Sequence, residues 1–356
     1  MKAFARMRFV MSHDARTPRP ATIPLAAKAQ LRFLYLAKHA SGNGSPDRID
    51  GNHAIYHHEM RTTLESIGLN LVTAQGFEAI ERKPEVDFVI PLLNRAGFQN
   101  SEMLGPLLLT RHGIPFLGAS PILRGVADDK HLMKALAKAR GVPTSEWAIH
   151  RSAAGAVAAP HFAFEKLVVK PNASSASWGI GVFENWRDAR EHVVDLNEQG
   201  HDVIMEPWTP LIDVAVPVIG GRGAQPWLLP AMAYMPEDPR HLRSYSEKRA
   251  LIATDDDPLA PVEDPELVRR LESHTRELAA ELWPFDYGRF EFRYDPASGE
   301  LRFMEVNLSC NLWSKKTISR SAAQIGIDHS ALVESIVAHS IARQGLLLPF
   351  LSRAAA

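Results

Sequence analysis

Short apolar runs alternate with amphipathic segments along the first third of the chain. Apolar runs of strand length occur at 31–36, 69–73, 86–93 and 114–117. Segments with helical spacing occur at 53–67 and 102–112, and each is followed by a glycine. This alternation is typical of a parallel, doubly wound sheet. Ligand loops lie at the carboxyl ends of the strands in such sheets, which indicates residues 41–51 and 94–101.

The pattern changes after about residue 124. A strong helix is predicted over 128–140, because Gly141 and Pro143 follow it. Short strands at 167–170 and 202–206, with a helix at 187–197 between them, predict a small α+β lobe. The remainder predicts a mainly antiparallel sheet covered by helices, with strands near 211–219, 228–234, 287–294 and 301–306 and helices near 263–282 and 329–343.

These patterns predict an α/β and α+β protein of several lobes. Its 356 residues are enough for two or three compact lobes. We expect a partly ordered leader at 1–30, an N-terminal domain at 31–123, a central lobe at 124–209, a C-terminal lobe at 210–346 and a tail at 347–356.

Composition narrows the class of protein. The net charge of -1 does not provide the basic surface that binds nucleic acid. No uninterrupted apolar stretch reaches eighteen residues, so no membrane-spanning helix is expected. The apolar run near Pro24 is too short and broken for a secretory signal. A single cysteine, Cys310, excludes an internal disulfide. A cytoplasmic protein with neither nucleic-acid nor membrane partners is expected.

The segment from Tyr287 to Asn311, YGRFEFRYDPASGELRFMEVNLSCN, carries the most chemical information. Two strands joined by a turn would bring Glu291, Glu305 and Asn307 together, because side chains alternate along a strand. Two carboxylates and an amide oxygen suit Mg²⁺, and Arg289 can neutralise phosphate charge beside them. A solvated surface hairpin is the alternative, which the apolar context RFMEV makes less attractive.

A lysine followed by a flexible turn suggests a phosphate site at VVKPNASSASWGIG, residues 168–181. Lys170 provides a compact charge, and the backbone N–H groups and hydroxyls of the turn, including Ser177, could hold the β- and γ-phosphates. Lys130 and Lys134 lie one helical turn apart, and only one of them need touch ATP. The alternatives are a surface hairpin and a surface helix stripe.

Two further segments suggest nucleotide contacts. Glu206, with Pro207 and Trp208 after it, is typical of a hinge between lobes, where Glu206 could accept from an adenine amino group and Asp213 from ribose hydroxyls. An ordinary strand and loop with a buried tryptophan is the alternative. In SYSEKRA, residues 244–250, the basic residues could reach a transferred phosphoryl group, although charge runs are usually solvated. These residues are Lys248 and Arg249, together with Arg243 immediately before the segment.

Two weaker signals remain. His53 and His57 have the spacing of a metal pair on one helix, with His58 beside them, but no third ligand is evident. A capping, substrate-contact or surface role is the alternative. Cys310 lies close to Asn307, but no His/Asp pattern supports a nucleophile, so a small site-lining residue is favoured.

In order along the chain, these segments resemble the ATP-grasp superfamily, and within it D-alanine–D-alanine ligase. The likeness extends from about Phe33 to Leu346 and rests on DFVIPLLNRAG, GIPFLGAS, DDK, VVKP, MEPW, EKR, GRFEF and MEVN. It implies an ATP-grasp fold, a ligase that forms an acyl-phosphate, ATP as cosubstrate, one or two Mg²⁺ ions that Mn²⁺ can replace, and a homodimer. For the nucleotide it implies phosphate binding by Lys130 and Lys170, adenine and ribose binding by Glu206 and Asp213, and γ-phosphate contact by Lys248. It implies that Arg289 stabilises the intermediates. It implies that Glu291, Glu305 and Asn307 bind magnesium.

The sequence departs from the family near the amino-acid pockets. Asn94 replaces a usual histidine, and Asn311 replaces the glycine of the usual Pro-Gly stretch. The phosphate loop reads SSASW at 174–178 in place of paired serines around a glycine. The early N-terminal loop lacks the usual Gly-rich turn with its glutamate. These differences favour a carboxylate and an amine other than two D-alanines.

Two other functions remain open at this point. One is an ATP-grasp enzyme with a non-amine acceptor or a kinase-like activity. The other is a non-catalytic nucleotide-binding protein, against which the complete set of Arg289, Glu291, Glu305 and Asn307 argues. ADP formation that depends on an added amine separates the ligase from both.

Overall fold

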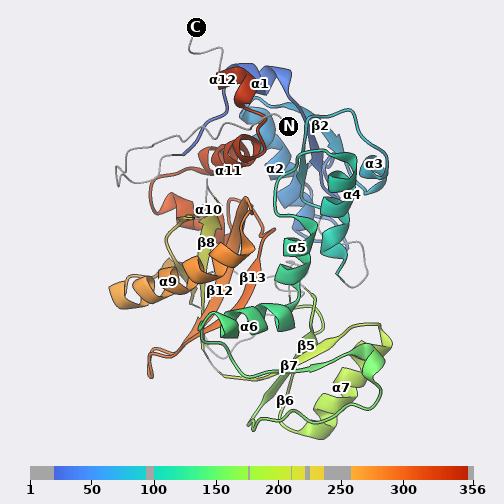
Figure 1. Cartoon of the computed structure of the whole chain (residues 1–356), viewed down its shortest axis with the longest axis vertical. Helices are drawn as coiled ribbons and strands as arrows, with labels where there is room; N and C mark the ends of the chain where they lie inside the picture. The colour runs from blue at the N-terminus through green and yellow to red at the C-terminus, as the bar shows by residue number, and fades with distance from the viewer. Residues whose placement is uncertain are drawn as a thin grey trace, which may run out of the picture.

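Three β-sheets succeed one another along the long axis of the molecule (Figure 1). The structure, a computed structural model, describes residues 20–93, 100–174, 177–209, 211–220, 225–235 and 258–351. A three-stranded sheet lies at one end, a six-stranded sheet in the middle and a four-stranded sheet at the other end. None of the helices within these ranges is long and apolar enough to cross a membrane.

The N-terminal sheet is parallel, as the alternating pattern predicts. Its strand order is β2-β1-β3. Along β1, Phe33 and Tyr35 pack into one core while Leu34 and Leu36 pack into another. Both faces of the strand are therefore buried, which explains its continuous apolar run. The elements of this part are β1 (Arg32–Leu36), α2 (His53–Ser66), β2 (Asn70–Ala74), α3 (Glu78–Glu81), β3 (Phe88–Pro91), η1 (Ser101–Met103) and α4 (Leu104–His112).

The strand predicted at 114–117 is not a full strand. Only an isolated parallel bridge joins Val89 to Phe116. Pro115 accepts a hydrogen bond from Val89 N at 3.0 Å but has no N–H of its own to donate, so a regular ladder cannot continue.

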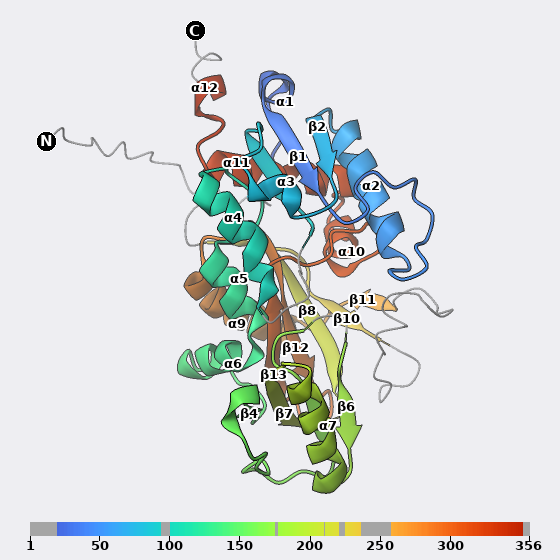
Figure 2. The same cartoon turned by 90° about the vertical axis from the view of Figure 1, so that its right-hand side faces the viewer.

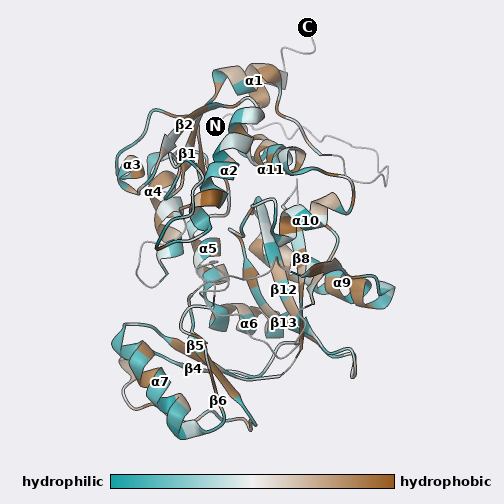
Figure 3. Cartoon of the chain, turned by 180° about the vertical axis from the view of Figure 1, so that it is seen from behind, coloured by the Kyte–Doolittle hydropathy of each residue, from teal (hydrophilic) through white to brown (hydrophobic). Residues whose placement is uncertain are grey.

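The four-stranded sheet is antiparallel and has the order β4-β7-β5-β6. Helix α7 covers one face with Ala189, Val193 and Leu196, which pack on Leu167 and Val203 of the sheet. The outer side of this helix is polar (Figure 3). The elements are β4 (Ala148–His150), η2 (Ser152–Ala154), β5 (Leu167–Pro171), β6 (Gly181–Phe183), α7 (Trp186–Glu198) and β7 (Val203–Pro207).

The central sheet has the order β11-β10-β8-β12-β13, with β9 also paired to β8. Its described pairs are antiparallel, as the sequence predicts. The strand predicted at 228–234 is two short strands, because Pro230 lies between them. The elements are β8 (Ile212–Ile219), β9 (Trp227–Leu228), β10 (Met232–Tyr234), β11 (Leu259–Pro261), α9 (Pro265–Leu282), β12 (Tyr287–Tyr294) and β13 (Leu301–Asn307).

The helix predicted at 128–140 is the second of two successive helices, α5 (Pro121–Asp128) and α6 (Lys130–Ala139). Asp129 has an extended backbone and separates them, and its carboxylate accepts Leu132 N at 2.9 Å as the N-cap of α6. The sequence pattern did not predict α5. This break sets the start of α6 at Lys130.

The C-terminal helices are α10 (Thr317–Ala323), α11 (His329–Arg343) and α12 (Leu348–Leu351). Together they contact both large parts of the molecule: α11 packs on α2 beside the N-terminal sheet, and α10 packs against β8 and β11 of the central sheet (Figures 1 and 2). Helix α1 (Leu25–Gln30) packs on α11, because Lys28 forms an ion pair with Glu334 at 2.8 Å and Ser335 accepts Ala21 N at 3.0 Å. Residues 20–30 of the expected leader are thus attached to the end of the chain.

A buried aspartate joins three distant segments. Asp286 is 2 % exposed and accepts hydrogen bonds from Gly118 N at 2.7 Å, Ser340 Oγ at 2.6 Å and Arg343 Nε at 2.9 Å. Burial raises the pKa of its carboxyl, although Arg343 and Ser340 oppose the shift. The charge is therefore retained only while its donors stay in place.

We predict that Asp286→Ala lowers the free energy of unfolding by about 3–5 kcal/mol, because it leaves the Arg343 guanidinium and the Gly118 amide without their buried acceptor. Urea unfolding followed by circular dichroism measures the change. Glu266→Ala, which removes an exposed i,i+3 ion pair with Arg269, is the control and should change stability by less than about 0.5 kcal/mol. Equal effects of the two substitutions would contradict this role for Asp286.

Candidate active site

A cavity of about 600 Å³ is lined by residues of the central and four-stranded sheets and by helix α2 and the segments that follow β1 and β3 of the N-terminal sheet. It brings together the predicted site residues that the structure describes, which are Lys130, Lys170, Ser177, Glu206, Trp208, Asp213, Arg289, Glu291, Glu305 and Asn307. Lys248, Arg243 and Arg249 lie outside the described residues, as does Asn94. The roles assigned to the ten residues from sequence remain predictions, but their common location is a property of the fold.

The hairpin β12–β13 arranges the predicted metal ligands. Glu291 is paired in register with Glu305, and Arg289 with Asn307. Between these pairs and the rest of the hairpin the register shifts, so that Phe292 pairs with Phe303 and β13 holds one extra residue. Residues two apart normally point to the same face of a strand. The extra residue breaks this alternation, so Glu305 faces the cavity although Phe303, two residues earlier, packs in the core.

Ion pairs hold the charged side chains of this hairpin. Arg289 donates to Glu291 Oε1 from Nε at 2.9 Å and from Nη2 at 2.5 Å. Burial alone would lower the pKa of Arg289, but Glu291 more than offsets it, so the guanidinium stays charged. Lys130 Nζ lies 3.8 Å from Glu305 Oε2. Asn307 Oδ1 accepts Ser309 N at 3.0 Å, which fixes the orientation of the amide.

This set of donors fits a magnesium ion. The two carboxylates and the Asn307 amide oxygen are hard oxygen ligands on adjacent strands, facing one cavity. Two facing carboxylates repel each other unless cations compensate them, and here Arg289 and Lys130 do so in part. A dication bound with ATP phosphates would complete the compensation.

A buried glutamate lies between two lysines at the other wall of the cavity. Glu206 is 3.0 Å from Lys134 Nζ and 2.8 Å from Lys170 Nζ. Burial alone would raise its pKa, but Lys134 and Lys170 lower it to about 2. Lys134 is fully buried and also donates to Thr144 Oγ1 at 3.0 Å. Lys134 is therefore a structural partner of Glu206, whereas Lys130, one turn earlier, is the lysine that reaches Glu305.

The two ion pairs of Glu206 compete with the adenine contact that was predicted for its carboxylate. Both carboxylate oxygens are already occupied by ammonium groups. The side chain thus acts first as a counter-charge that keeps Lys170 at the cavity, a role that the sequence pattern did not suggest.

The turn that follows β5 places hydrogen-bond donors at the cavity. Lys130 Nζ donates to Ser174 O at 3.1 Å, so the lysine bridges this turn and the hairpin. Ser177 has a left-handed backbone, with φ of 61°, and its buried hydroxyl has no hydrogen-bond partner among the described residues. A strained residue with an unsatisfied hydroxyl facing a cavity is typical of a ligand site.

The predicted ribose and hinge residues also line the cavity. Asp213 is 2.8 Å from Arg293 Nε on the neighbouring strand, with which it is in register. Trp208 donates its backbone N–H to Lys166 O at 2.9 Å, and the Lys166 ammonium lies 5.7 Å from the centre of its ring. The tryptophan lines the cavity and is not an ordinary core residue.

The far end of the cavity contains residues that sequence reasoning missed or underrated. His53 and His57 line it, while His58 instead contacts Gly42 O at 3.0 Å. No motif indicated the other residues; a charged Arg124 on the buried face of an apolar helix is the signal that could have been used. The missed residues are Lys38, Tyr56, Glu102, Arg124, Ser309 and Lys316, whereas Asp50 lies in the loop 41–51 that the strand pattern indicated.

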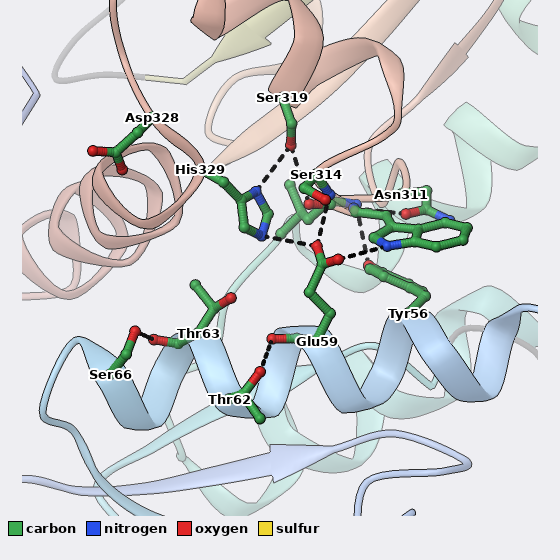
Figure 4. A network of polar contacts seen from close by, with 12 residues as sticks. Tyr56, Glu59, Thr62, Thr63, Ser66, Asn311, Ser314, Ser319, Asp328 and His329 are labelled. Atoms are coloured by element: carbon green, nitrogen blue, oxygen red, sulfur yellow. Dashed lines mark hydrogen bonds and ion pairs between the residues drawn. The ribbon is translucent and has the colours of Figure 1, made fainter. Parts of the chain in front are cut away.

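Helix α2 is joined to the loop that follows β13 by a polar network (Figure 4). Glu59 accepts Trp313 Nε1 at 2.8 Å and Ser314 N at 2.9 Å. Tyr56 Oη accepts Leu312 N at 3.1 Å. The loop that carries Asn311 at the cavity is thereby fixed to an element more than 250 positions earlier in the chain.

Two residues with nucleophilic side chains, Ser319 and Cys310, lie in surroundings that do not favour nucleophilic attack on a ligand in the cavity. His329 lies between Glu59, at 3.5 Å, and Ser319 Oγ, at 3.2 Å, which are the residue types of a hydrolase triad. Ser319 is buried, outside the cavity lining, and it donates to Leu312 O. Cys310 packs in a core, and burial raises the pKa of its thiol to about 12.

Known proteins share both the sequence pattern and this fold. No family model matches the chain. It is 25% identical to the D-alanine–D-alanine ligase of Aquifex aeolicus, over 72% of this chain and 83% of that one, and 26% identical to that of Marinomonas sp., over 73% and 80%. A D-alanine–D-alanine ligase of Bacillus anthracis, solved with ATP, superposes with a TM-score of 0.67 at 19% identity, over 88% of this chain and 99% of that one.

The chain has the ATP-grasp fold and resembles D-alanine–D-alanine ligases. The solved enzyme of Vibrio cholerae, D-alanyl-alanine synthetase A, agrees with this at a TM-score of 0.66 and 13% identity. We class the chain as an ATP-dependent ligase that forms C–N bonds. In this ATP-grasp ligase the hairpin, the lysines and the end beside α2 share one cavity.

We predict that Lys134→Met in this ATP-grasp ligase lowers the free energy of unfolding by about 3–5 kcal/mol, because the buried Glu206 carboxylate then has Lys170 as its only ammonium partner among the described residues. Lys138→Met, one turn later and exposed, is the control. A destabilisation equal to that of the control would contradict the role of Lys134.

The depressed pKa of Glu206 predicts a pH dependence with a definite sign. Its folded pKa of about 2 lies below the ordinary 4.5, so the unfolded chain binds more protons between these values. Its contribution to stability is complete above pH 4.5 and is lost as the pH falls toward 2. Urea unfolding between pH 6 and 3 should show a shallower decline in Glu206→Gln than in the unaltered protein.

We predict that Glu59→Ala loosens the loop 311–316, because it removes the acceptor of the Trp313 indole and of the Ser314 amide. Stability should fall by about 1–3 kcal/mol. Hydrogen exchange of the Ser314 amide should accelerate, and Glu65→Ala on the exposed side of the same helix should leave it unchanged. Unchanged exchange in Glu59→Ala would show that the loop is held by other contacts.

Proposed function

We propose that the chain is an ATP- and Mg²⁺-dependent ligase that joins a carboxylate to an amine through an acyl-phosphate, and that its substrates are not two molecules of D-alanine. The observation that carries the proposal is the common cavity of Arg289, Glu291, Glu305 and Asn307 with Lys130 and Lys170. A protein that only bound a nucleotide would not need a complete oxygen-ligand set beside an arginine fixed for contact with an anion.

Each lobe would contribute to nucleotide binding. Lys130 and Lys170 would contact phosphate oxygens, and the unsatisfied Ser177 hydroxyl would donate to one of them. Trp208 and Asp213 would lie along the adenosine part. Glu291, Glu305 and Asn307 would hold Mg²⁺, which neutralises phosphate charge when bound.

The chemistry would proceed in two transfers. An oxygen of the carboxylate substrate attacks the γ-phosphorus of ATP, the bond from that phosphorus to the bridging oxygen breaks, and ADP leaves. The amine nitrogen then attacks the acyl carbon, a proton leaves the nitrogen, and inorganic phosphate departs. Arg289 carries its charge in a fixed position, because Glu291 holds it by two hydrogen bonds, so it can stabilise the added negative charge without reorganising.

The departures from the family favour a different substrate pair. Asn311 and Lys316 both line the cavity in the loop that the Glu59 network holds. The β1–α2 segment contributes Lys38, His53 and His57 to the cavity. These are large or basic side chains at the end of the cavity where small neutral amino acids would have to fit.

The test is ADP and phosphate release with MgATP and a library of carboxylates and amines, singly and in pairs. We expect release that requires both an acid and an amine, with Glu305→Ala reducing turnover by at least about 100-fold through loss of a metal ligand. Glu300→Ala, on the exposed turn of the same hairpin, is the matched control and should retain activity. Chelation should abolish release, and Mg²⁺ or Mn²⁺ should restore it.

The outcomes separate the alternatives. Release that needs an acid alone, with a phosphorylated product, would indicate a kinase-like enzyme. Binding of ATP without release from any pair would contradict the ligase. Efficient synthesis of D-alanyl-D-alanine would leave the ligase intact and refute the proposed change of substrate.

A further inference from the structure

The loop after β13 meets the N-terminal domain directly beside the predicted metal ligands. Ser309 Oγ donates to Glu102 Oε2 at 3.1 Å, and Arg124 Nη2 lies 3.1 Å from the same oxygen. Glu102 belongs to η1 and Arg124 to α5, which packs on both η1 and β13. None of these three residues is among the predicted magnesium ligands, so the ligand set alone does not explain their contact.

Asn307, the last residue of β13, is oriented by this loop. Its Oδ1 accepts the backbone N–H of Ser309 at 3.0 Å, a hydrogen bond typical of an asparagine that begins a turn. An Asn307 amide turned the other way would set its own donor against this N–H, so the oxygen end is the one held here. The hydrogen bond uses one of the two lone pairs of the amide oxygen, and a magnesium ion needs the other.

The hydroxyl of Ser309 competes for that second lone pair. Its Oγ lies 3.4 Å from Asn307 Oδ1 as well as 3.1 Å from Glu102 Oε2. A hydroxyl has a single proton, so it can donate to only one of these two oxygens at a time. Donation to Asn307 would occupy the lone pair that a magnesium ligand has to offer.

The carboxylate of Glu102 is the stronger of the two acceptors. Hydrogen bonds to an ionised carboxylate are shorter and stronger than those to a neutral amide, and the contact of Ser309 with Glu102 is the shorter one. Arg124, which is 5 % exposed, pairs with the same carboxylate oxygen and so fixes its place. The charged Glu102 therefore holds the hydroxyl proton away from Asn307.

We propose that Glu102 is a positioning residue for the metal site: it draws the Ser309 hydroxyl proton to itself and leaves Asn307 Oδ1 available as a ligand of Mg²⁺. Groups that hydrogen-bond to metal ligands commonly tune metal affinity in this way. The inference rests on the proposed function, in which Asn307 binds magnesium. It adds a residue of the N-terminal domain that acts on the metal only through Ser309.

The test is Mn²⁺ binding with a non-hydrolysable ATP analogue, measured as the loss of the electron paramagnetic resonance signal of free Mn²⁺, which needs no turnover. Glu102→Gln keeps an oxygen that can accept from Arg124 and Ser309 but removes the charge, so the hydroxyl can turn to Asn307. We expect the dissociation constant of Mn²⁺ to rise about tenfold. Glu81→Gln, an exposed glutamate of α3 outside the cavity lining, is the control and should match the unaltered protein.

Removal of the hydroxyl separates this role from simple packing. Ser309→Ala keeps the backbone N–H that orients Asn307 and removes the competing proton, so the dissociation constant should stay within about twofold of the unaltered protein. The double substitution Glu102→Gln/Ser309→Ala should regain the original affinity, because no hydroxyl proton then competes for Asn307. A Glu102 that only supports the fold predicts a double variant that binds Mn²⁺ no better than Glu102→Gln.

The failures of the inference and of the proposed function are distinguishable. Unchanged affinity in Glu102→Gln, or no recovery in the double variant, would overturn the inference while nucleotide-dependent Mn²⁺ binding, abolished by Glu305→Ala, leaves the metal site in place. Absence of such binding in the unaltered protein would overturn the metal site and the inference with it. If Glu102→Gln does not fold, Ser309→Ala alone decides: retained affinity is the expected result, and a tenfold loss would contradict the inference.

Discussion

The register of the β12–β13 hairpin determines where the charged groups of the cavity lie. Phe290, Phe292, Phe303 and Val306 bury one face of the hairpin, so a slip of one residue would expose them and turn the charged side chains into the core. The bulge at Met304 is part of this constraint, because it allows the core positions on β13 to change phase. The large apolar burial on one face thus fixes Glu291 opposite Glu305 on the other.

Charges in the cavity are compensated before any ligand binds. Arg289 contacts Glu291, Lys130 approaches Glu305, and Lys170 contacts Glu206. Carboxylates and cations kept in pairs avoid the cost of isolated buried charges. A nucleotide with its metal would add phosphate and Mg²⁺ to these paired groups without creating an unpaired charge. In the proposed reaction, such a prearranged field provides much of the rate enhancement.

Local patterns in the sequence predicted most of the helices and strands and singled out Lys130, Lys170 and Glu305, which line one cavity. Period-two alternation placed Glu305 and Asn307 on one face. The helix predicted from residue 128 instead begins at Lys130, because Asp129 caps it. Contacts between distant segments were not accessible in this way. The Glu59–Trp313 hydrogen bond joins residues 254 positions apart, and no local pattern announces it.

The predictions that the structure contradicts failed because backbone chemistry or contacts between distant segments overrode the local sequence pattern. The apolar run at 114–117 satisfied a strand pattern, but Pro115 allows only a bridge. Lys134 and Lys130 look equivalent from their spacing, and both are buried and line the cavity. The three-dimensional packing alone separates Lys134, which pairs with Glu206 on β7, from Lys130, which approaches Glu305 on β13. Arg124 and Glu102 were missed because they pair with each other across two short helical segments, a contact that no local pattern indicates.

The central claim is that ATP and its metal bind between the hairpin and the lysines of one cavity. A crystal structure with Mn²⁺ and a non-hydrolysable ATP analogue, with anomalous scattering used to locate the manganese, tests it most directly. The account predicts an anomalous peak coordinated by Glu291, Glu305 and Asn307, with triphosphate oxygens within reach of Lys130 and Lys170. A nucleotide bound elsewhere, or manganese bound away from these three side chains, would contradict it.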